Sequence, residues 1–236
     1  MKQTNKDDMT QVVPESGETY RNVAFDDLDL SRGEYRDCVF EDCSFVGTNF
    51  RAADLSGSRF EKCQFNDADS DMPADLSHAN LKEASFDRCN LTVVDCIGIK
   101  GYALIMSHCQ LQGADLSKSD FRLPIADSDL TEVTIEHCNL SYANLSNNYL
   151  VDAVLRDNRL TECSLDYTDL SQADLRGSEL YNISAIGVTL IGADLRGASF
   201  NNLNPRDIEL TDVKITPEQV GTLMEGLGII VLDDAE

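Results

Sequence analysis

Eight cysteines and three histidines are the side chains of this sequence best suited to metal binding or nucleophilic catalysis. A structural zinc site usually needs ligand pairs about two to four residues apart, and the closest cysteines here, Cys38 and Cys43, are five residues apart. The histidines are also far from one another in sequence. We therefore expect no catalytic residue, metal site, cofactor or small-molecule substrate. The residues concerned are Cys38, Cys43, Cys63, Cys89, Cys96, Cys109, Cys138, Cys163, His78, His108 and His137.

A five-residue repeat explains the placement of the cysteines. Segments such as Cys43-Ser44-Phe45 and Ala173-Asp174-Leu175 contain a small residue, a polar residue and then Leu or Phe, and two further residues follow. A helix needs apolar spacings of about three and four, and a strand needs a spacing of about two, so neither accommodates this pattern. We expect each pentad to be a short extended segment ending in a bend. Four pentads would form one square coil, and coils would stack about 4.8 Å apart.

The repeat also predicts which side chains point inward. The small residue and the Leu or Phe should face the core, while the other three positions face solvent. Seven cysteines take the small inward position and Cys96 takes the large one, so all should be buried thiols, whereas the histidines should point outward. Gly101 and Ala185 stand where a large residue is expected, which predicts irregular coils near residues 96–106 and 183–188.

The net charge of -23, from 42 acidic and 19 basic side chains, disfavours direct binding to nucleic acid or to an anionic membrane and predicts basic partners. The charge could serve solubility alone. Spread along a rod of about 45 Å, however, it comes to one charge per about 2 Å, close to the value of about 1.7 Å for duplex DNA. The sequence therefore favours an acidic surface that imitates DNA, built from outward aspartates that precede large inward positions. These are Asp54, Asp75, Asp115, Asp120, Asp129, Asp169, Asp174 and Asp194.

Two segments interrupt the phase of the repeat. The interval from Phe65 to Leu76 is 11 residues where 10 would keep the phase, and the interval from Phe121 to Ile135 is 14. Each interruption predicts a loop that leaves the coil, either to contact a partner or as a neutral insertion at a corner. Loop A consists of Asn66, Asp67, Ala68, Asp69, Ser70, Asp71, Met72 and Pro73. Loop B consists of Arg122, Leu123, Pro124, Ile125, Ala126, Asp127 and Ser128.

The end of the chain departs from the repeat. Thr216, Pro217 and Gln219 stand as the cap, first residue and capping-box partner of a helix, and Gly228 is placed to end it. An apolar stripe on that helix would cover the last coil, and residues 229–232 should form a short strand. The expected cap and dimer residues are Val220, Leu223, Met224, Leu227, Ile229 and Val231. Capping within a single chain is the alternative to dimer formation.

The sequence thus divides into a polar extension over residues 1–19, a repeat over 20–215 and a closing segment over 216–236. The extension contains no apolar run typical of a secretory signal, and the chain nowhere has about eighteen consecutive apolar residues. We expect a soluble cytoplasmic protein with reduced cysteines.

These features resemble the pentapeptide-repeat proteins, and within them the Qnr family, which protects DNA gyrase and topoisomerase IV from fluoroquinolones. The resemblance rests on the pentads, on two interruptions at the places of the smaller and larger Qnr loops, and on the C-terminal helix. It implies an all-β fold, a right-handed quadrilateral β-helix with two projecting loops and a capping helix that forms a homodimer. It also implies binding to gyrase or topoisomerase IV through both loops. A pentapeptide-repeat scaffold or adaptor for a different basic protein is the alternative, and loop B is shorter and different in residues from that of a typical Qnr protein.

Overall fold

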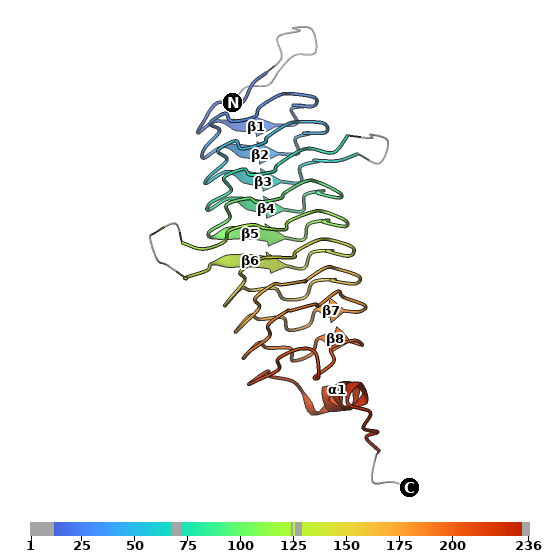
Figure 1. The fold of residues 1–236 in the computed structure, drawn as a ribbon. Coiled ribbons are helices and arrows are strands. Elements are labelled where there is room, and N and C mark those ends of the chain that lie inside the picture. Colours follow the sequence, from blue (N-terminus) through green and yellow to red (C-terminus); the bar gives the residue numbers. More distant parts are fainter. Residues whose placement is uncertain (1–11, 68–71, 124, 126–128, 233–236) are drawn as a thin grey trace.

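The computed structural model describes residues 12–67, 72–123, 125 and 129–232. The chain winds into a right-handed β-helix whose coils stack from the N-terminal end to a short C-terminal helix (Figure 1). The expected all-β solenoid is therefore confirmed.

One parallel sheet runs along the N-terminal part of the stack. Its strands pair in chain order, from β1 to β6, so each coil adds one strand (Figure 1). They are β1 (Thr19–Arg21), β2 (Val39–Glu41), β3 (Arg59–Glu61), β4 (Ser85–Asp87), β5 (Leu104–Ser107) and β6 (Val133–Glu136). A second parallel pair, β7 (Glu179–Leu180) and β8 (Ser199–Phe200), lies nearer the C-terminus.

Four flat faces follow from the register. Face 1 contains β1 to β6, face 2 contains β7 and β8, and faces 3 and 4 follow in chain order within each coil. Isolated parallel bridges continue every face between coils. Face 3 is defined by the outward column Asp29, Asn49, Asp75, Asp95, Asp115, Asn144, Ser164 and Ser184. Face 4 carries the column Glu34, Asp54, Asn80, Lys100 and Asp120, and further along Tyr149, Asp169, Thr189 and Glu209.

Each face ends in a tight turn. After Phe50, the Ala53 N–H donates to the Phe50 carbonyl at 2.8 Å, and Ala52 takes a φ of 56°. The second residue after an inward Leu or Phe adopts this left-handed conformation at most turns of the described stack, whether it is Gly, Asn, Asp or a larger residue, but not at Asp67, Leu123 and Asn202. A pentad therefore matches one extended segment plus one turn.

The interior contains stacked side chains of equivalent positions. Phe40, Phe60 and Phe86 of face 1 stack with centroid distances of 5.0 and 4.6 Å. The small inward positions hold polar groups that bond to the neighbouring coil: the Ser58 hydroxyl accepts from Cys38 N at 3.0 Å and donates to the Tyr35 carbonyl at 2.8 Å. The core thus leaves few backbone groups unpaired although it is narrow.

All eight cysteines are buried and free of disulfides, as the repeat predicts. The thiols of the cysteines at the small inward position donate to backbone carbonyls, as Cys63 does to Phe40 at 3.4 Å. Burial raises the pKa of the Cys96 and Cys163 thiols, which disfavours the reactive thiolate. These cysteines act as small core residues.

Val93 illustrates the strain in the turns, since this β-branched, half-exposed residue has a φ of 54°. Val93→Asn is expected to raise the free energy of unfolding by roughly 0.5–1 kcal/mol, because asparagine tolerates the left-handed conformation. Urea denaturation measures the change, with Thr161→Asn as the control at a turn position without positive φ. A lower midpoint for Val93→Asn would show that contact of the valine with Gly113 outweighs the strain.

The expected coil irregularities near Gly101 and Ala185 are absent, and the turns continue through both regions. At Gly101 the interior is filled by a neighbour, because a Cβ built there would lie 2.7 Å from Cδ1 of Phe121. The coil stays regular because Phe121, one coil further on, occupies the space of the missing side chain.

The C-terminal segment begins as expected. A 3-10 turn (Pro217–Gln219) leads into α1 (Val220–Gly226), and the Thr216 N–H donates to Gln219 Oε1 at 2.7 Å. The Gln219 amide also donates to the Leu195 and Ala198 carbonyls at 2.6 Å, so it closes the open backbone of the last coils. Leu223 is buried and Met224 packs on the core, while Val220 and Leu227 are partly exposed.

The expected strand over residues 229–232 is wrong for the single chain. Gly228 ends the helix with a φ of 76°, and the four residues after it are exposed and pair with no strand of the described chain. No helix among the described residues has the length and apolar character needed to cross a membrane.

Candidate macromolecule-binding surface

Three carboxylates on face 3 form an unpaired ladder. Asp75 is bridged to Asp95 and Asp95 to Asp115 on successive coils. One oxygen of each accepts the backbone N–H two residues on, at 2.8 to 2.9 Å. Among the described residues, none of these three aspartates takes part in an ion pair. All three also help to raise the pKa of the Cys96 thiol beneath them, after burial itself. Face 3 therefore presents fixed negative charges about 4.8 Å apart.

The sequence interpretation identified Asp75 and Asp115 but missed Asp95. It selected aspartates that precede an inward Leu, Phe or similar large residue, and Cys96 occupies that position in this pentad. The signal was present in the phase of the repeat, because Asp95 lies 20 residues from both neighbours in the ladder.

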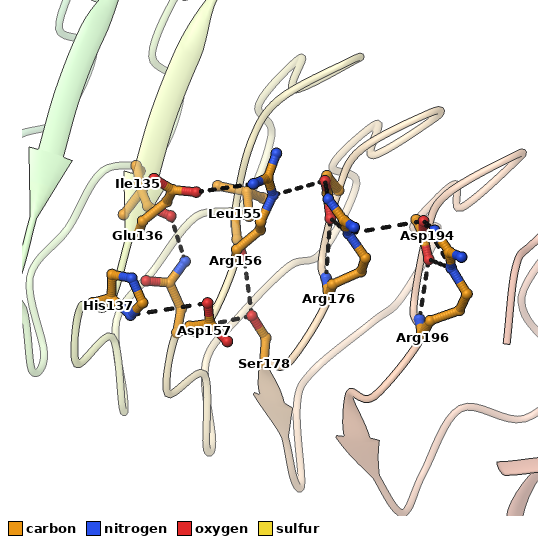
Figure 2. A network of polar contacts seen from close by, with 12 residues as sticks. Ile135, Glu136, His137, Leu155, Arg156, Asp157, Arg176, Ser178, Asp194 and Arg196 are labelled. Carbon is orange, nitrogen blue, oxygen red and sulfur yellow. Dashed lines mark hydrogen bonds and ion pairs between the residues drawn. The ribbon is translucent and has the colours of Figure 1, made fainter. Parts of the chain in front are cut away.

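On face 1 the predicted acidic surface is wrong, because Asp174 and Asp194 lie within a ladder of arginines. Figure 2 shows the arginines of this ladder, Arg156, Arg176 and Arg196, on successive coils. Arg176 contacts Asp174 at 2.7 Å, Arg156 contacts the same carboxylate at 2.8 Å, and Arg196 contacts Asp194 at 2.6 Å. Arg176 also reaches toward Asp194, and Arg156 toward Glu136. The carboxylates of this part of face 1 are thus neutralised by arginines that stand either two residues further along the chain or on the neighbouring coil.

On face 4 the predicted acids are partly neutralised. Asp54 accepts from Arg36 at 2.6 Å and Asp120 accepts from Arg122 at 2.9 Å. Asp169 accepts from the backbone and side chain of Ser171 and takes part in no ion pair of the described chain. Asp129 is exposed beside loop B. Among the outward columns of the described chain, the longest run of successive carboxylates without an ion pair is therefore Asp75, Asp95 and Asp115 on face 3.

The pairing at Asp174 predicts a pH dependence of stability. Arg176 and then Arg156 lower the pKa of this carboxyl to about 2 from its usual value near 3.8. Because the folded-state pKa is the lower one, the stabilisation is complete above about pH 4 and is lost as the pH falls through about 2. Asp174→Asn should lower the free energy of unfolding at pH 7 by roughly 1–2 kcal/mol, with the partial exposure of both arginines taken into account.

Thermal denaturation between pH 7 and pH 2 measures this effect. The difference between Asp174→Asn and the unaltered protein should shrink as the pH falls below 4, and Asp212→Asn serves as the control at an exposed aspartate on a turn. A difference that is constant with pH would contradict the assigned pairing.

The histidines point outward, as expected, but two of them are not isolated. His108 and His137 lie on successive coils, and their rings stack with centroids 5.1 Å apart. Sequence spacing concealed the pair, because loop B adds residues between two equivalent turn positions. Among the residues that the structure describes, no group of three or more ligand side chains could hold a metal ion.

The two loops leave the stack on opposite sides (Figure 1). Loop A departs between faces 2 and 3, where Asn66 is largely buried, Asp67 is exposed, Pro73 is partly exposed and Met72 is 64% exposed. Loop B departs between faces 4 and 1, and Leu123 N donates to the Leu130 carbonyl at 2.7 Å across its base. The remaining predicted loop residues lie outside the described ranges, namely Ala68, Asp69, Ser70, Asp71, Pro124, Ala126, Asp127 and Ser128.

The described residues of loop B are held at its base. Arg122 pairs with Asp120, lies 6.0 Å from the centre of the Tyr149 ring and forms an antiparallel bridge to Thr131. Ile125 is 64% exposed beyond this base. The base of loop B is thus held by these contacts, and the loop presents the apolar side chain of Ile125 to solvent.

Family models identify the structural class of this protein. Models described as "Pentapeptide repeat region" and "Pentapeptide repeats (8 copies)" match residues 18–91 and, in overlapping segments, 128–202. The fold and the pentads therefore define a pentapeptide-repeat protein.

Individual relatives then narrow the family. The full-length structure of QnrB1, described as a plasmid-mediated fluoroquinolone resistance protein, is 30% identical, with a TM-score of 0.84 over 89% of this chain and 100% of that one. The quinolone resistance pentapeptide repeat protein QnrB96 of Scandinavium goeteborgense is 31% identical over 51% of this chain and 57% of its own. QnrB4 of Escherichia coli is 31% identical over 50% and 55%. The aligned part thus spans about half the length of these curated relatives. This chain belongs to the Qnr family of pentapeptide-repeat proteins.

Proposed function

We propose that this protein binds DNA gyrase or topoisomerase IV in the cytoplasm and protects them from fluoroquinolones by occupying a surface that otherwise holds DNA. The observation that carries the proposal is the unpaired carboxylate ladder of Asp75, Asp95 and Asp115 on a rigid rod. A DNA-binding enzyme offers fixed cations in a groove shaped for a duplex. A rod with carboxylates locked by backbone hydrogen bonds can enter such a groove at little entropic cost.

The names of the relatives support this function, since they are described as quinolone resistance proteins. We propose that loop A and loop B contact the enzyme around the docked rod and destabilise its drug-trapped complex with cleaved DNA. No chemical step is needed for this role, because the protein acts by binding alone.

The proposal includes a homodimer joined at the C-terminal end. Ile230 and Leu232 are each 81% exposed just after α1, and Ile229 and Val231 are about half exposed. A second copy of this segment would supply the missing strand partner and bury these side chains.

Supercoiling by purified gyrase in the presence of ciprofloxacin tests the proposal. Adding the protein is expected to restore supercoiling, and versions that lack residues 66–73 or 122–128 should restore less. A parallel decatenation assay tests topoisomerase IV. Absence of rescue over a wide concentration range in both assays would overturn the proposal and favour an adaptor for another basic protein, which a pull-down without gyrase subunits would support.

A further inference from the structure

Exposed apolar side chains are distributed unevenly over the coils. Apart from loops A and B, Leu130 beside loop B and the ends of the described chain, the large exposed ones are Val93, Ile105, Tyr142, Tyr167, Tyr181 and Ile186. All except Ile105 lie in the two rows of turns that join face 3 to faces 2 and 4. Scattered exposed residues need no explanation, but their concentration beside one face indicates an interaction surface.

The two most exposed tyrosines stand at the edges of this face. Tyr142 comes directly before the segment that contains Asn144, and Tyr167 is the second residue of the turn that joins the Ser164 segment of face 3 to the Asp169 segment of face 4. Tyr142 is 62% and Tyr167 is 64% exposed. The Tyr167 ring lies against the turn of the next coil, since a Cβ at Gly187 would be 2.9 Å from its Cδ1. This contact holds the ring in place.

The local backbone gains nothing from a tyrosine at these positions. Both residues have positive φ, 63° for Tyr142 and 57° for Tyr167, where Gly, Asn or Asp would be less strained. Their hydroxyls bond to no other described residue in the structure. Side chains that cost stability and stay exposed are more simply explained by contact with a partner than by folding.

Charge indicates the chemistry of that partner. Face 3 continues from the carboxylates Asp75, Asp95 and Asp115 to the neutral polar residues Asn144, Ser164 and Ser184, which the tyrosines flank. Carboxylates bind Lys and Arg side chains, and an exposed tyrosine ring receives a guanidinium or the aliphatic stem of a lysine. Face 1, on the opposite side of the coil, has its C-terminal acids neutralised by the arginine ladder (Figure 2).

We propose that face 3 is the docking surface of this protein, that it receives an arginine- and lysine-rich protein surface, and that Tyr142 and Tyr167 anchor the contact. The identity of the partner rests on the function proposed above, whereas the choice of face rests on the side chains of this chain alone. Tyrosines are among the residues that most often contribute a large share of the binding energy of an interface, while charges set orientation and association rate.

The first experiment measures binding of gyrase to the Tyr142→Asn/Tyr167→Asn double variant by biolayer interferometry. Asparagine suits the positive φ, so the variant should melt no lower than the unaltered protein. Its affinity is expected to fall about tenfold or more. Ile105→Thr is the matched control, because Ile105 is 48% exposed on face 1 and pairs with Thr134 of the next coil. An unchanged affinity for the double variant, or a larger loss for Ile105→Thr, would overturn the choice of face.

A second experiment separates the face from the identity of the partner. A photo-crosslinking amino acid is placed at position 142 or at position 105 of the full chain, and a deca-arginine peptide is the probe. Crosslinking is expected from position 142 and at most weakly from position 105. Crosslinking from 142 without any binding of gyrase would refute the proposed target while supporting face 3, and equal crosslinking from both positions would refute face 3.

Discussion

Neutralising the face 3 ladder with Asp75→Asn, Asp95→Asn and Asp115→Asn together is expected to weaken binding to gyrase by roughly 30-fold near physiological salt. Each exposed charge pair contributes about 0.7 kcal/mol, so three lost pairs cost about 2 kcal/mol, which corresponds to a change of this size. A single substitution should have a small effect, because the carboxylates act collectively and salt screens each one.

The same triple variant should be more stable than the unaltered protein. Carboxylates on successive coils repel one another, which costs on the order of 1 kcal/mol in total at this spacing. The side-chain oxygen of asparagine can still accept the backbone N–H two residues further on. In the same column, Asn49 Oδ1 accepts from Arg51 N at 2.9 Å and Asn144 Oδ1 accepts from Ser146 N at 3.0 Å. Opposite changes in stability and affinity would identify the ladder as a functional feature.

Asp174→Asn provides the matched comparison, because this aspartate has the opposite surroundings. Its loss should lower stability and leave binding nearly unchanged, since Arg156 and Arg176 already neutralise it. Urea denaturation and an affinity titration at several salt concentrations measure both quantities, and the affinity of the triple variant should depend less on salt. If Asp174→Asn weakened binding as much as the triple variant, the run of unpaired carboxylates on face 3 would not be what the partner recognises.

The phase of the repeat predicted most of the fold because each inward position is set by local sequence. Phe45, Leu81 and Leu145, for example, are buried where the pentads place them. The two phase slips likewise located both loops, and Thr216 and Gln219 located the cap. These features depend on residues that are close in sequence, so the sequence pattern alone predicts them.

Features that depend on contacts between coils were harder to predict. Arg156 meets Asp174 18 residues away, and whether a long side chain bends toward the next coil or into solvent is not encoded in the repeat. The His108–His137 stack was concealed because an insertion changes the spacing of equivalent positions. Only the three-dimensional register shows which acids are free.

Position 101 is expected to reject the large apolar residue that the repeat carries at equivalent positions. Gly101→Leu restores the residue type that most pentads carry, yet it is expected to lower the free energy of unfolding by about 1–3 kcal/mol. A Cβ at this position would lie 2.7 Å from Phe121 Cδ1 and 3.3 Å from Leu104 Cδ2, and both side chains are fully buried. The coil has no free volume to relieve the contact.

A double substitution separates overpacking from other causes. Gly101→Leu combined with Phe121→Leu should recover most of the lost stability, because the smaller side chain at position 121 frees the space that the new leucine needs. Urea denaturation of the single and double variants measures the coupling. Since Phe121 is the last inward residue before loop B, the single variant should also make the root of that loop more sensitive to trypsin at Arg122, and a Gly101→Leu protein as stable as the unaltered one would refute the packing described for this coil.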